Sequence, residues 1–316
     1  MASKPVLLDC DPGIDDTLAL IYLAGLHSLG EIELHAVTTT AGNADVATTA
    51  RNAAWVLNAC GISTIPVVPG EPAPQKVPLV TTPETHGDSG LGYFNAPEHM
   101  LGDDYVDLWQ RAVDTHGRDL HVIVTGPATN VSAFRSRDPQ RFAELVNITV
   151  MGGAVNHRGN STPTAEWNFW VDPHAAADIF DHAPCPITLC SLEVTDQMLV
   201  GPERLQDIVD KLGATAIAQY LPEILRFYFE FHQAKGEGYQ AQIHDLLTCM
   251  IALGTIDFAA TATTVAVETE SPLLRGTSVA DVRGHWGRQP NARLVTSAAI
   301  QAAHDEFDRA CAALNR

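Results

Sequence analysis

Short apolar runs alternate along the chain with segments of helical periodicity. Six ranges have the apolar, β-branched character of buried strands: 6–11, 33–40, 65–70, 121–126, 147–153 and 185–194. Four ranges repeat their apolar residues with the helical period: 14–26, 45–61 (ended by Gly61), 173–183 and 214–234. A short helix is expected from Ala128, and a final helix over 298–314. This alternation predicts an α/β fold with a mostly parallel sheet covered by helices on both faces.

The sequence contains no obvious boundary between domains. The stretch 263–297 has β character, but neither an internal repeat nor a low-complexity linker separates it from the rest. The 316 residues are 46% hydrophobic and 18% charged, which favours a folded unit with a substantial core over a disordered chain. We therefore expect a single domain over 1–316.

Charge and cysteine content restrict the expected partners and compartment. The formal net charge is −19 and the pI is about 4.9, so the surface would repel nucleic acids and anionic membranes. No apolar run reaches the roughly 18 residues of a membrane span, and the first strand begins too early to leave room for a signal peptide. The six cysteines have no C-x-x-C spacing, as in a chain with reduced core thiols. These features predict a cytoplasmic protein that binds neither nucleic acid nor membranes.

The first predicted strand is followed by a cluster of aspartates. The segment LLDCDPGIDD contains Asp9, Asp11, Asp15 and Asp16. Asp9 and Asp11 are two residues apart, so they would point the same way on a strand, and the other two fall in the first turn of a helix. Capping explains one such aspartate, not four. Because packed carboxylates need a cation or raised pKa values, and Ca²⁺ takes about 6–8 oxygen ligands, the cluster predicts a metal site.

Polar residues also follow the later strands. Asn43, Thr125 and Met151 (which precedes two glycines) come after three separate apolar runs. Ligands of open α/β sheets bind beyond the carboxyl ends of the strands. The pattern therefore predicts that these residues converge on the same edge as the aspartates.

Three other types of site share parts of these motifs. An EF-hand loop would not have Gly13 and Ile14 at its fifth and sixth positions. A phosphatase of the haloacid dehalogenase type also begins with a strand and D-x-D and uses Mg²⁺, but the Thr or Val that follows its motif is absent and it gives the Asp15–Asp16 pair no role. The segment GDSG (87–90) resembles the nucleophile motif of trypsin-like proteases, which are all-β, so in an α/β chain it indicates a glycine-rich loop.

Taken in order along the chain, a larger set of motifs resembles the inosine-uridine nucleoside hydrolases. These motifs are DCDPGIDD, TTTAGN (38–43), HGDSGLG (86–92), TGPATN (125–130), MGGAV (151–155), GNSTPTAEWNFWVDPHAA (159–176) and IHDLL (243–247), with a weaker match in RGTSVAD (275–281). The resemblance implies a single-domain fold with an open, mixed, mainly parallel sheet flanked by helices. It also implies Ca²⁺-dependent hydrolysis of the N-glycosidic bond of ribonucleosides to free base and ribose, in nucleoside salvage.

The resemblance also assigns roles to individual residues. The implied metal ligands are Asp11, Asp15, Asp16, Asp245 and the backbone carbonyl of Thr125. Asp11 is in addition the implied general base acting on water, and His244 and His86 match the histidines beside the leaving base. The implied contacts to the ribose are Asn43, Asn160, Glu166 and Asn168. Apart from the resemblance, Phe169 is a further candidate pocket residue, and Met151, before two glycines, either lines the ribose pocket or only ends its strand.

Several neighbouring residues are given supporting or structural roles. Asp9 is expected to orient the other carboxylates, and Asp172 to cap a helix. Phe169 is expected to be the pocket member of an aromatic group that otherwise packs in the core. Tyr228 and Tyr239 are candidates to close over the base, and the histidines other than His86 and His244 are expected at the surface.

The histidine pair favours an inosine-uridine or pyrimidine-preferring enzyme, and family members commonly form homodimers or homotetramers. Two alternatives stay open at this stage. One is a nucleoside-binding protein without hydrolytic activity, which would not need an acid and a base. The other is a metal-dependent phosphatase, although no Lys or Arg phosphate clamp stands near the aspartates.

Overall fold

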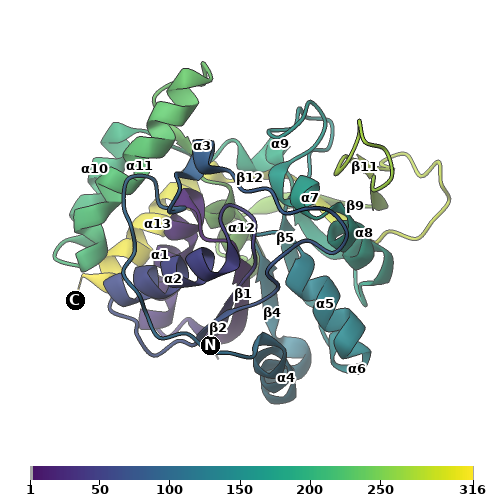
Figure 1. Cartoon of the computed structure of the whole chain (residues 1–316), viewed down its shortest axis with the longest axis horizontal. Helices are drawn as coiled ribbons and strands as arrows, with labels where there is room; N and C mark the ends of the chain where they lie inside the picture. The colour runs from purple at the N-terminus through teal and green to yellow at the C-terminus, as the bar shows by residue number, and fades with distance from the viewer. Residues whose placement is uncertain (1–2, 316) are drawn as a thin grey trace.

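A mainly parallel β-sheet runs through the centre of the molecule (Figure 1). The computed structural model describes residues 3–315. Its eight-stranded sheet has the order β3-β2-β1-β4-β5-β6-β12-β9, and among these strands only β9 is antiparallel to its neighbour. The strands are β1 (Lys4–Cys10), β2 (Ile32–Thr39), β3 (Val67–Pro69), β4 (His121–Val124), β5 (Asn147–Met151), β6 (Ile187–Cys190), β9 (Phe258–Thr263) and β12 (Ala292–Ala298). The predicted open, mixed, mainly parallel sheet is confirmed.

The strand order changes direction beside β1. The chain passes from β1 to β2 and β3 on one side, then returns to place β4 on the other side of β1. Such a switch point leaves a crevice at the carboxyl ends of the two central strands, where ligands of doubly wound sheets bind. Asp11 follows β1 and Thr125 follows β4, so both lie at this crevice.

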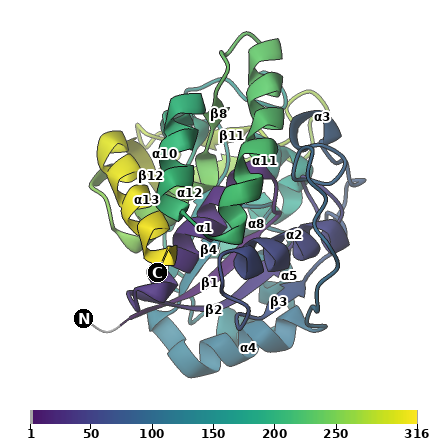
Figure 2. The ribbon, with the colours of Figure 1, turned by 90° about the vertical axis from the view of Figure 1, so that its left-hand side faces the viewer.

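Helices cover both faces of the sheet, as Figures 1 and 2 show. Alternate residues of β1 enter different cores: Val6 and Leu8 pack on one face, and Leu7 on the other. The Val6 face is covered by α1 (Ile14–Ser28), α2 (Val46–Ala59), α10 (Pro202–Leu212), α11 (Ala216–Ala234), α12 (His244–Leu253) and α13 (Ile300–Leu314). The Leu7 face is covered by α4 (Tyr105–His116), α5 (Thr129–Arg137) and α8 (Pro173–His182).

Short elements complete the chain. They are the helices α3 (Pro83–His86), η1 (Gly117–Asp119), α6 (Pro139–Phe142), α7 (Trp167–Val171) and α9 (Leu192–Thr195), and the strands β7 (Leu199–Val200), β8 (Ala241–Gln242), β10 (Val265–Val267) and β11 (Ser278–Ala280). β7 pairs with β8 and β10 with β11, each pair antiparallel.

Some elements differ from the sequence-based expectation. Helices α4 and α10 were not predicted. The strand expected over 185–194 ends at Cys190, because the chain turns into α9 after Ser191. The β segment expected over 263–297 begins earlier, at Phe258, and its strands divide between the edge of the main sheet and the β10–β11 hairpin.

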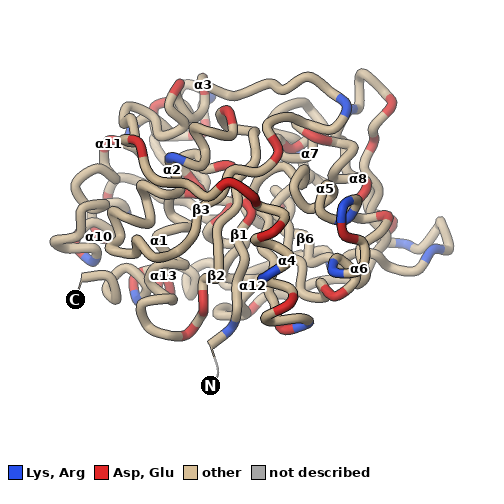
Figure 3. The backbone as a smooth tube through the Cα atoms, turned by 60° about the horizontal axis from the view of Figure 1, so that its bottom comes forward, with Lys and Arg blue, Asp and Glu red and all other residues tan. Residues whose placement is uncertain are grey.

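Acidic positions outnumber basic ones over the whole fold. Figure 3 shows Asp and Glu spread over many elements and the fewer Lys and Arg scattered among them.

The helices of residues 3–315 include none whose length and apolar character would allow it to cross a bilayer.

Candidate active site

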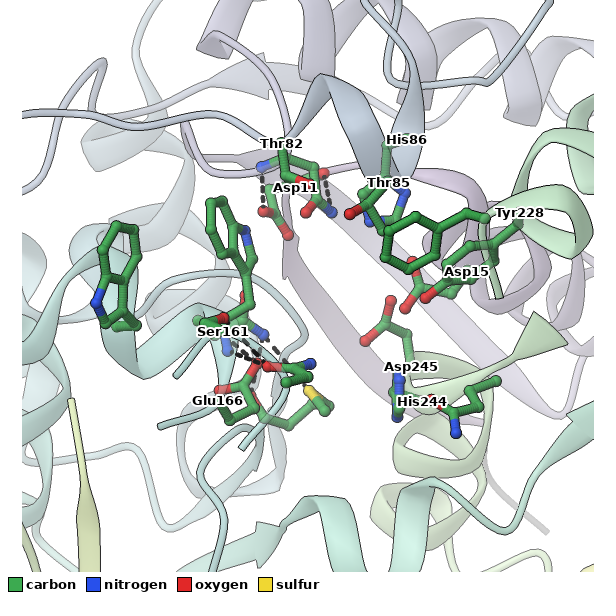
Figure 4. A pocket seen from close by; sticks show the side chains of 18 of the residues that line it. Asp11, Asp15, Thr82, Thr85, His86, Ser161, Glu166, Tyr228, His244 and Asp245 are labelled. Carbon is green, nitrogen blue, oxygen red and sulfur yellow. Dashed lines mark hydrogen bonds between the residues drawn. The ribbon is translucent and has the colours of Figure 1, made fainter. Parts of the chain in front are cut away.

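A cavity of about 510 Å³ lies at the carboxyl end of the sheet. This size is typical of small-molecule sites. Its walls come from the loops after β1, β2, β4 and β5 and from α3, α7, α11 and α12. Figure 4 shows the side chains of Asp15 and Asp245 facing one another, with His86 and Tyr228 on one side of the cavity and Glu166 on the other.

Four buried aspartates lie at the floor of this cavity: Asp11, Asp15 and Asp245 line it, and Asp16 lies behind them beside Asp15 and Asp245. Asp11 follows β1, Asp15 and Asp16 lie in the first turn of α1, and Asp245 lies in the first turn of α12. Oxygens of Asp15, Asp16 and Asp245 all lie within 4.8 Å of one another. The predicted cluster is therefore assembled from three separate segments and includes Asp245, which is distant in sequence.

Hydrogen bonds hold these carboxylates but leave some of their oxygens free. Asp16 accepts the backbone N–H of Gly13 at 3.1 Å and the hydroxyl of Thr125 at 2.9 Å, and Asp11 Oδ2 accepts the backbone N–H of Asn43 at 2.7 Å. Oδ1 of Asp11 and Oδ1 of Asp15 are buried and have no hydrogen-bond partner among residues 3–315. Burying a carboxylate oxygen without a hydrogen-bond partner costs free energy. The arrangement therefore fits a cation bound between these oxygens.

Burial raises the pKa values of the cluster. It raises the pKa of Asp15 to about 6 and, helped by the charge of Asp15, that of Asp16 to about 8. Burial first and the neighbouring aspartates second raise the pKa values of Asp11 and Asp245 well above the usual range. A bound divalent cation would oppose these shifts, because it favours the ionised carboxylates.

Asp9 does not join the other aspartates. Its Oδ1 accepts the hydroxyl of Thr38 at 2.6 Å and the side-chain amide of Asn130 at 2.7 Å, and the residue does not line the cavity. Asp11 lies beyond the end of β1 and lines the cavity, whereas Asp9 lies within β1 and has other partners, so the two aspartates do not share one site as the sequence predicted. Asp9 instead ties β1 to β2 and α5.

Glu166 and Asn168 form the wall opposite the histidines. Glu166 caps α7 and accepts the backbone N–H groups of Asn168, Phe169 and Gly153 at 2.8–3.2 Å. The Asn168 amide donates to the backbone carbonyl of Thr125 at 2.7 Å and to that of Met151 at 3.3 Å. The Thr125 carbonyl, which the resemblance gives to the metal, thus already accepts one hydrogen bond.

Asn43, Asn160 and Met151 also line the cavity, whereas Phe169 does not. The Phe169 ring is buried against Gly152, where an added Cβ would lie 2.3 Å from it, and near Phe180. The expected substrate contact of Phe169 is therefore corrected: its neighbours Trp167 and Trp170 line the cavity instead.

His86 and His244 approach the cavity from different helices. The Nδ1 atom of His86 accepts the backbone N–H of Ile14 at 3.0 Å, so the ring proton is on Nε2. His244 begins α12, and its Nδ1 lies 3.0 Å from the hydroxyl of Thr195. Burial lowers the pKa of both histidines to about 3, so both are neutral at pH 7 and act through one N–H and one lone pair each.

A third histidine, His232, was missed because it was expected at the surface. It lies near the end of α11, is 4% exposed and lines the cavity. Its Nδ1 is 2.6 Å from Oε2 of Glu237, its Nε2 is buried without a partner, and its ring lies 4.5 Å from that of Tyr228. The helical spacing of Leu221, Tyr228 and His232 on one buried face was the available signal.

The two tyrosines that were expected to close over the base lie in different environments in the structure. Tyr228 is buried and lines the cavity, 5.3 Å from the His86 ring between ring centres. Tyr239 is exposed and packs on Phe229. The cavity also contacts Gln242, Lys235 and Glu237, which the motifs did not identify.

Two other motif segments have structural roles. Ser89 of GDSG donates its hydroxyl to the carbonyl of Phe94 at 2.7 Å, within a turn. Asp172 caps α8 by accepting the backbone N–H of Ala175 at 3.0 Å. Both agree with the roles expected from the sequence.

Comparison with known proteins gives consistent matches over the whole length. The family model described as inosine-uridine preferring nucleoside hydrolase matches residues 6–305. The pyrimidine-specific ribonucleoside hydrolase RihA of Shewanella sp. (strain MR-7) is 34% identical over 297 residues, 93% of this chain and 91% of the relative. RihA of Salmonella paratyphi C (strain RKS4594) is 32% identical over 298 residues, 92% of this chain and 93% of the relative.

Solved structures share the same fold. A purine-preferring ribonucleoside hydrolase from Gardnerella vaginalis has a TM-score of 0.88 at 27% identity, covering 98% of this chain and 99% of that chain. The plant nucleoside hydrolase PpNRh1 has a TM-score of 0.85 at 24% identity, covering 98% and 99%, and is similar in fold.

Proposed function

Because the chain belongs to the inosine-uridine preferring nucleoside hydrolase family, and so to the ribonucleoside-cleaving glycosidases, we propose that it is a Ca²⁺-dependent hydrolase of pyrimidine ribonucleosides. The relatives that are 32–34% identical are described as pyrimidine-specific, whereas the structural neighbour at 27% is described as purine-preferring. The greater identity to the former supports the pyrimidine preference. The products would be the free base and ribose.

The donor set of the floor supports Ca²⁺ as the ion. Asp11, Asp15, Asp16 and Asp245 offer only oxygen atoms, and Thr125 adds a backbone carbonyl. Hard cations such as Ca²⁺ prefer oxygen ligands, whereas Zn²⁺ favours nitrogen and sulfur. The free Oδ1 atoms of Asp11 and Asp15 are where such an ion would be held.

Water activation is assigned to Asp11. When bound, the Ca²⁺ supplies a positive charge that polarises the attacking water. Asp11 lines the cavity, and its Oδ1 has no other hydrogen-bond partner, so it can take a proton from that water. Its Oδ2 is fixed by the Asn43 backbone, which keeps the carboxylate oriented.

Ribose recognition is assigned to the polar residues between the aspartates and α7. Asn43, Glu166 and Asn168 are buried and Asn160 lies at the rim, where its Oδ1 accepts the backbone N–H of Trp167 at 2.9 Å. Cleavage of a glycosidic bond passes through an oxocarbenium-like transition state. Carboxylate and amide oxygens stabilise the developing positive charge more than they stabilise the neutral sugar, which is what catalysis requires.

The leaving base is assigned to the histidine side of the cavity. His86 offers an Nε2–H, because its Nδ1 is occupied by Ile14. His244 is the proposed acid, held at Nδ1 by Thr195. Both rings are neutral, so they would assist the departing base by donating a hydrogen bond as negative charge develops on it.

The observation that carries this proposal is the pairing of a buried, oxygen-only cation site with neutral histidines across one cavity. It is tested by measuring ribose release from uridine, cytidine, inosine, adenosine and guanosine, before and after removal of metal with a chelator. We expect uridine and cytidine to be the best substrates, with activity lost on chelation and restored by Ca²⁺. Full activity after verified removal of the metal would contradict the Ca²⁺ assignment, and preferred cleavage of purine nucleosides would contradict the base preference.

The two alternatives have weaker support. Lys235 is the one Lys or Arg among the described residues lining the cavity, so a phosphatase would lack a clamp for its phosphate. A non-hydrolytic binding protein would bind nucleosides in the same assay without releasing ribose. The cytoplasmic location, the homodimeric or homotetrameric state and the extent of the catalytic domain over 1–316 stay predictions.

A further inference from the structure

A second cluster of metal-ligating side chains lies at the opposite end of the sheet from the candidate active site. It consists of Glu33 and His35 near the start of β2 and His116 at the end of α4. Figures 1 and 2 both show α4 at the bottom of the molecule, away from α3, which carries His86. The cluster is therefore separate from the floor aspartates.

The geometry points to a Zn²⁺ site formed by Glu33, His35 and His116. Nε2 of His116 is 3.1 Å from Nδ1 of His35 and 3.9 Å from Oε1 of Glu33, and all three ligand atoms lie within 4.8 Å of one another. In a tetrahedral Zn²⁺ site with bonds of about 2.0–2.1 Å, ligand atoms are about 3.3 Å apart. Small side-chain movements would bring the three atoms to this separation.

The local backbone makes the arrangement plausible without rearrangement of the fold. Glu33 and His35 lie close together on β2, and the register of β2 with β1 shifts at His35, where Leu34 pairs with Val6 and Ala36 with Leu7. His116 reaches the same place from the C-terminal end of α4, and its ring lies at 87° to that of His35, with 4.9 Å between ring centres. One strand and one helix thus supply the ligands.

The space beside the cluster also allows a bound ion. A cleft of about 410 Å³ opens beside Glu33 and His116 and leaves room for water as a fourth ligand. Asp119 and Lys4 both line this cleft and their charges offset one another, so the ligand set itself determines which ion is bound. Two imidazoles and one carboxylate select Zn²⁺ or a similar transition metal over Ca²⁺, so the two sites of the chain would bind different ions.

The consequence would be a link between β2 and α4. These two elements pack against one another on the Leu7 face of the sheet, and a shared ion would join them. Because a metal that binds the folded chain stabilises it by mass action, Zn²⁺ should raise the thermal unfolding temperature. The distance from the cavity predicts that ribose release is unaffected.

The test is calorimetric titration of Zn²⁺ into the full-length protein with the acidic floor saturated by Ca²⁺. We expect one equivalent to bind, and a fall in affinity of at least tenfold in each of His116→Ala and Glu33→Gln, because loss of even a supporting group of a metal site costs roughly 10–100-fold. His99→Ala, which changes a half-buried histidine outside the cluster, is the matched control and should bind as the wild type does.

Cobalt provides an independent readout that does not depend on activity. Co²⁺ in place of Zn²⁺ should give the visible absorption of a tetrahedral nitrogen-containing site in the wild type and lose it in His116→Ala. Glu33 is exposed, so Glu33→Gln should fold even if a histidine variant does not. Absence of Zn²⁺ binding to the wild type would overturn the proposal. Equal binding by the wild type, Glu33→Gln and His116→Ala would also overturn it, because it would show that His35 and His116 share only a hydrogen bond.

Discussion

The backbone N–H of Ile14, the first residue of α1, donates to Nδ1 of His86 at 3.0 Å. This bond connects helix α1, which carries Asp15 and Asp16, to helix α3, which carries His86. It also fixes the tautomer of His86, because an Nδ1 that accepts a hydrogen bond carries a lone pair, which leaves the ring hydrogen on Nε2. His86 therefore presents a donor to the substrate.

Two amide substitutions should separate the functions of the two nitrogens of His86. His86→Gln can place an N–H group near the position of Nε2, whereas His86→Asn can only replace the acceptor at Nδ1. We expect His86→Asn to lose more of kcat/KM for uridine, by roughly 10²-fold or more, because the proton donor is absent. Equal losses in both variants, measured at unchanged unfolding temperature, would argue against a donor role for Nε2.

Asp11 and Asp9 offer a matched comparison of two buried aspartates. Asp11→Asn should reduce kcat for uridine by several orders of magnitude, because an amide cannot take a proton from water. Asp9→Asn should keep kcat within about tenfold, because Asp9 faces Thr38 and Asn130 instead of the cavity. Steady-state kinetics with saturating Ca²⁺ tests both. A turnover of Asp11→Asn near that of the wild type would exclude Asp11 as the base.

Removal of the metal should make stability depend on pH with a defined sign. In the metal-free chain, burial raises the pKa of Asp9 from 3.8 to about 7, of Asp16 from 3.8 to about 8 and of Glu166 from 4.5 to about 7. At these carboxyl groups the folded chain binds more protons than the unfolded chain between about pH 4 and pH 8, which makes the free energy of unfolding fall as pH rises. The buried His86 and His244, with pKa values lowered to about 3, act in the opposite sense up to about pH 6.5, but the buried carboxyl groups outnumber them and extend to higher pH. We expect a lower unfolding temperature at pH 8 than at pH 5.5.

Added Ca²⁺ should largely remove this pH dependence. Its ligands must be ionised, so the ion binds more tightly at pH 8, where fewer protons compete. Thermal unfolding with chelator and with Ca²⁺ at both pH values measures the effect. A metal-free protein that is more stable at pH 8 than at pH 5.5 would show that the carboxylates are not protonated as proposed.

Most strands of the sheet and most of the acidic floor were predictable because their residues are close in sequence. The pattern of apolar runs located most of the main strands but not their order in the sheet, and Asp11, Asp15 and Asp16 come from one motif, whereas Asp245 was expected only through the family resemblance. Helix α4 was missed although Asp104 caps it by accepting the backbone N–H of Asp107 and its buried residues have helical spacing (Tyr105, Leu108, Trp109, Ala112 and Val113).

The wrong predictions at the candidate active site concern residues whose side-chain direction depends on tertiary packing. Trp167, Phe169 and Trp170 are close together in the sequence, and only the contact of the Phe169 ring with Gly152 decides which of them enters the core. His232 lies on a helical face that otherwise packs in the core, so nothing in the local pattern distinguishes a cavity residue from a core residue. Sequence reasoning identifies such residue types, while tertiary packing determines which of them meets the ligand.

His244 should matter most for substrates with poor leaving groups. His244→Ala should reduce kcat/KM for uridine by roughly 10²–10⁴-fold, the usual effect of losing a positioned acid. The loss for p-nitrophenyl riboside should be much smaller, because its phenolate departs without a proton. Parallel assays of the two substrates measure the difference, and equal losses on both would argue against the acid role of His244.

Thr195 provides a second test of the same assignment, since its hydroxyl lies 3.0 Å from Nδ1 of His244 and should orient the ring. Thr195→Val keeps the shape of the side chain but removes the hydroxyl, and we expect it to lower kcat for uridine by about tenfold with little change in KM. Thr195→Ser should restore most of the activity. If Thr195→Ser is no more active than Thr195→Val, then Thr195 only packs against the ring of His244.

His232 should recognise an N–H group of the base. Glu237 lies 2.6 Å from Nδ1 of His232, and a carboxylate accepts the hydrogen there, so Nε2 of His232 carries a lone pair that faces no protein partner. Both uracil and cytosine have N–H groups on the ring edge away from the sugar. Replacing His232 with leucine should raise KM for uridine by about tenfold, the effect of losing one buried hydrogen bond, with a smaller change in kcat.

The p-nitrophenyl riboside gives the control, because its leaving group has no N–H to donate. His232→Leu should leave KM for this substrate nearly unchanged, and His232→Gln, whose amide oxygen can accept a hydrogen bond, should recover part of the affinity for uridine. If KM rises equally for both substrates, His232 shapes the cavity wall without reading the base. If it rises for uridine alone, the His232–Glu237 pair is a determinant of base recognition that lies outside the motifs shared with the family.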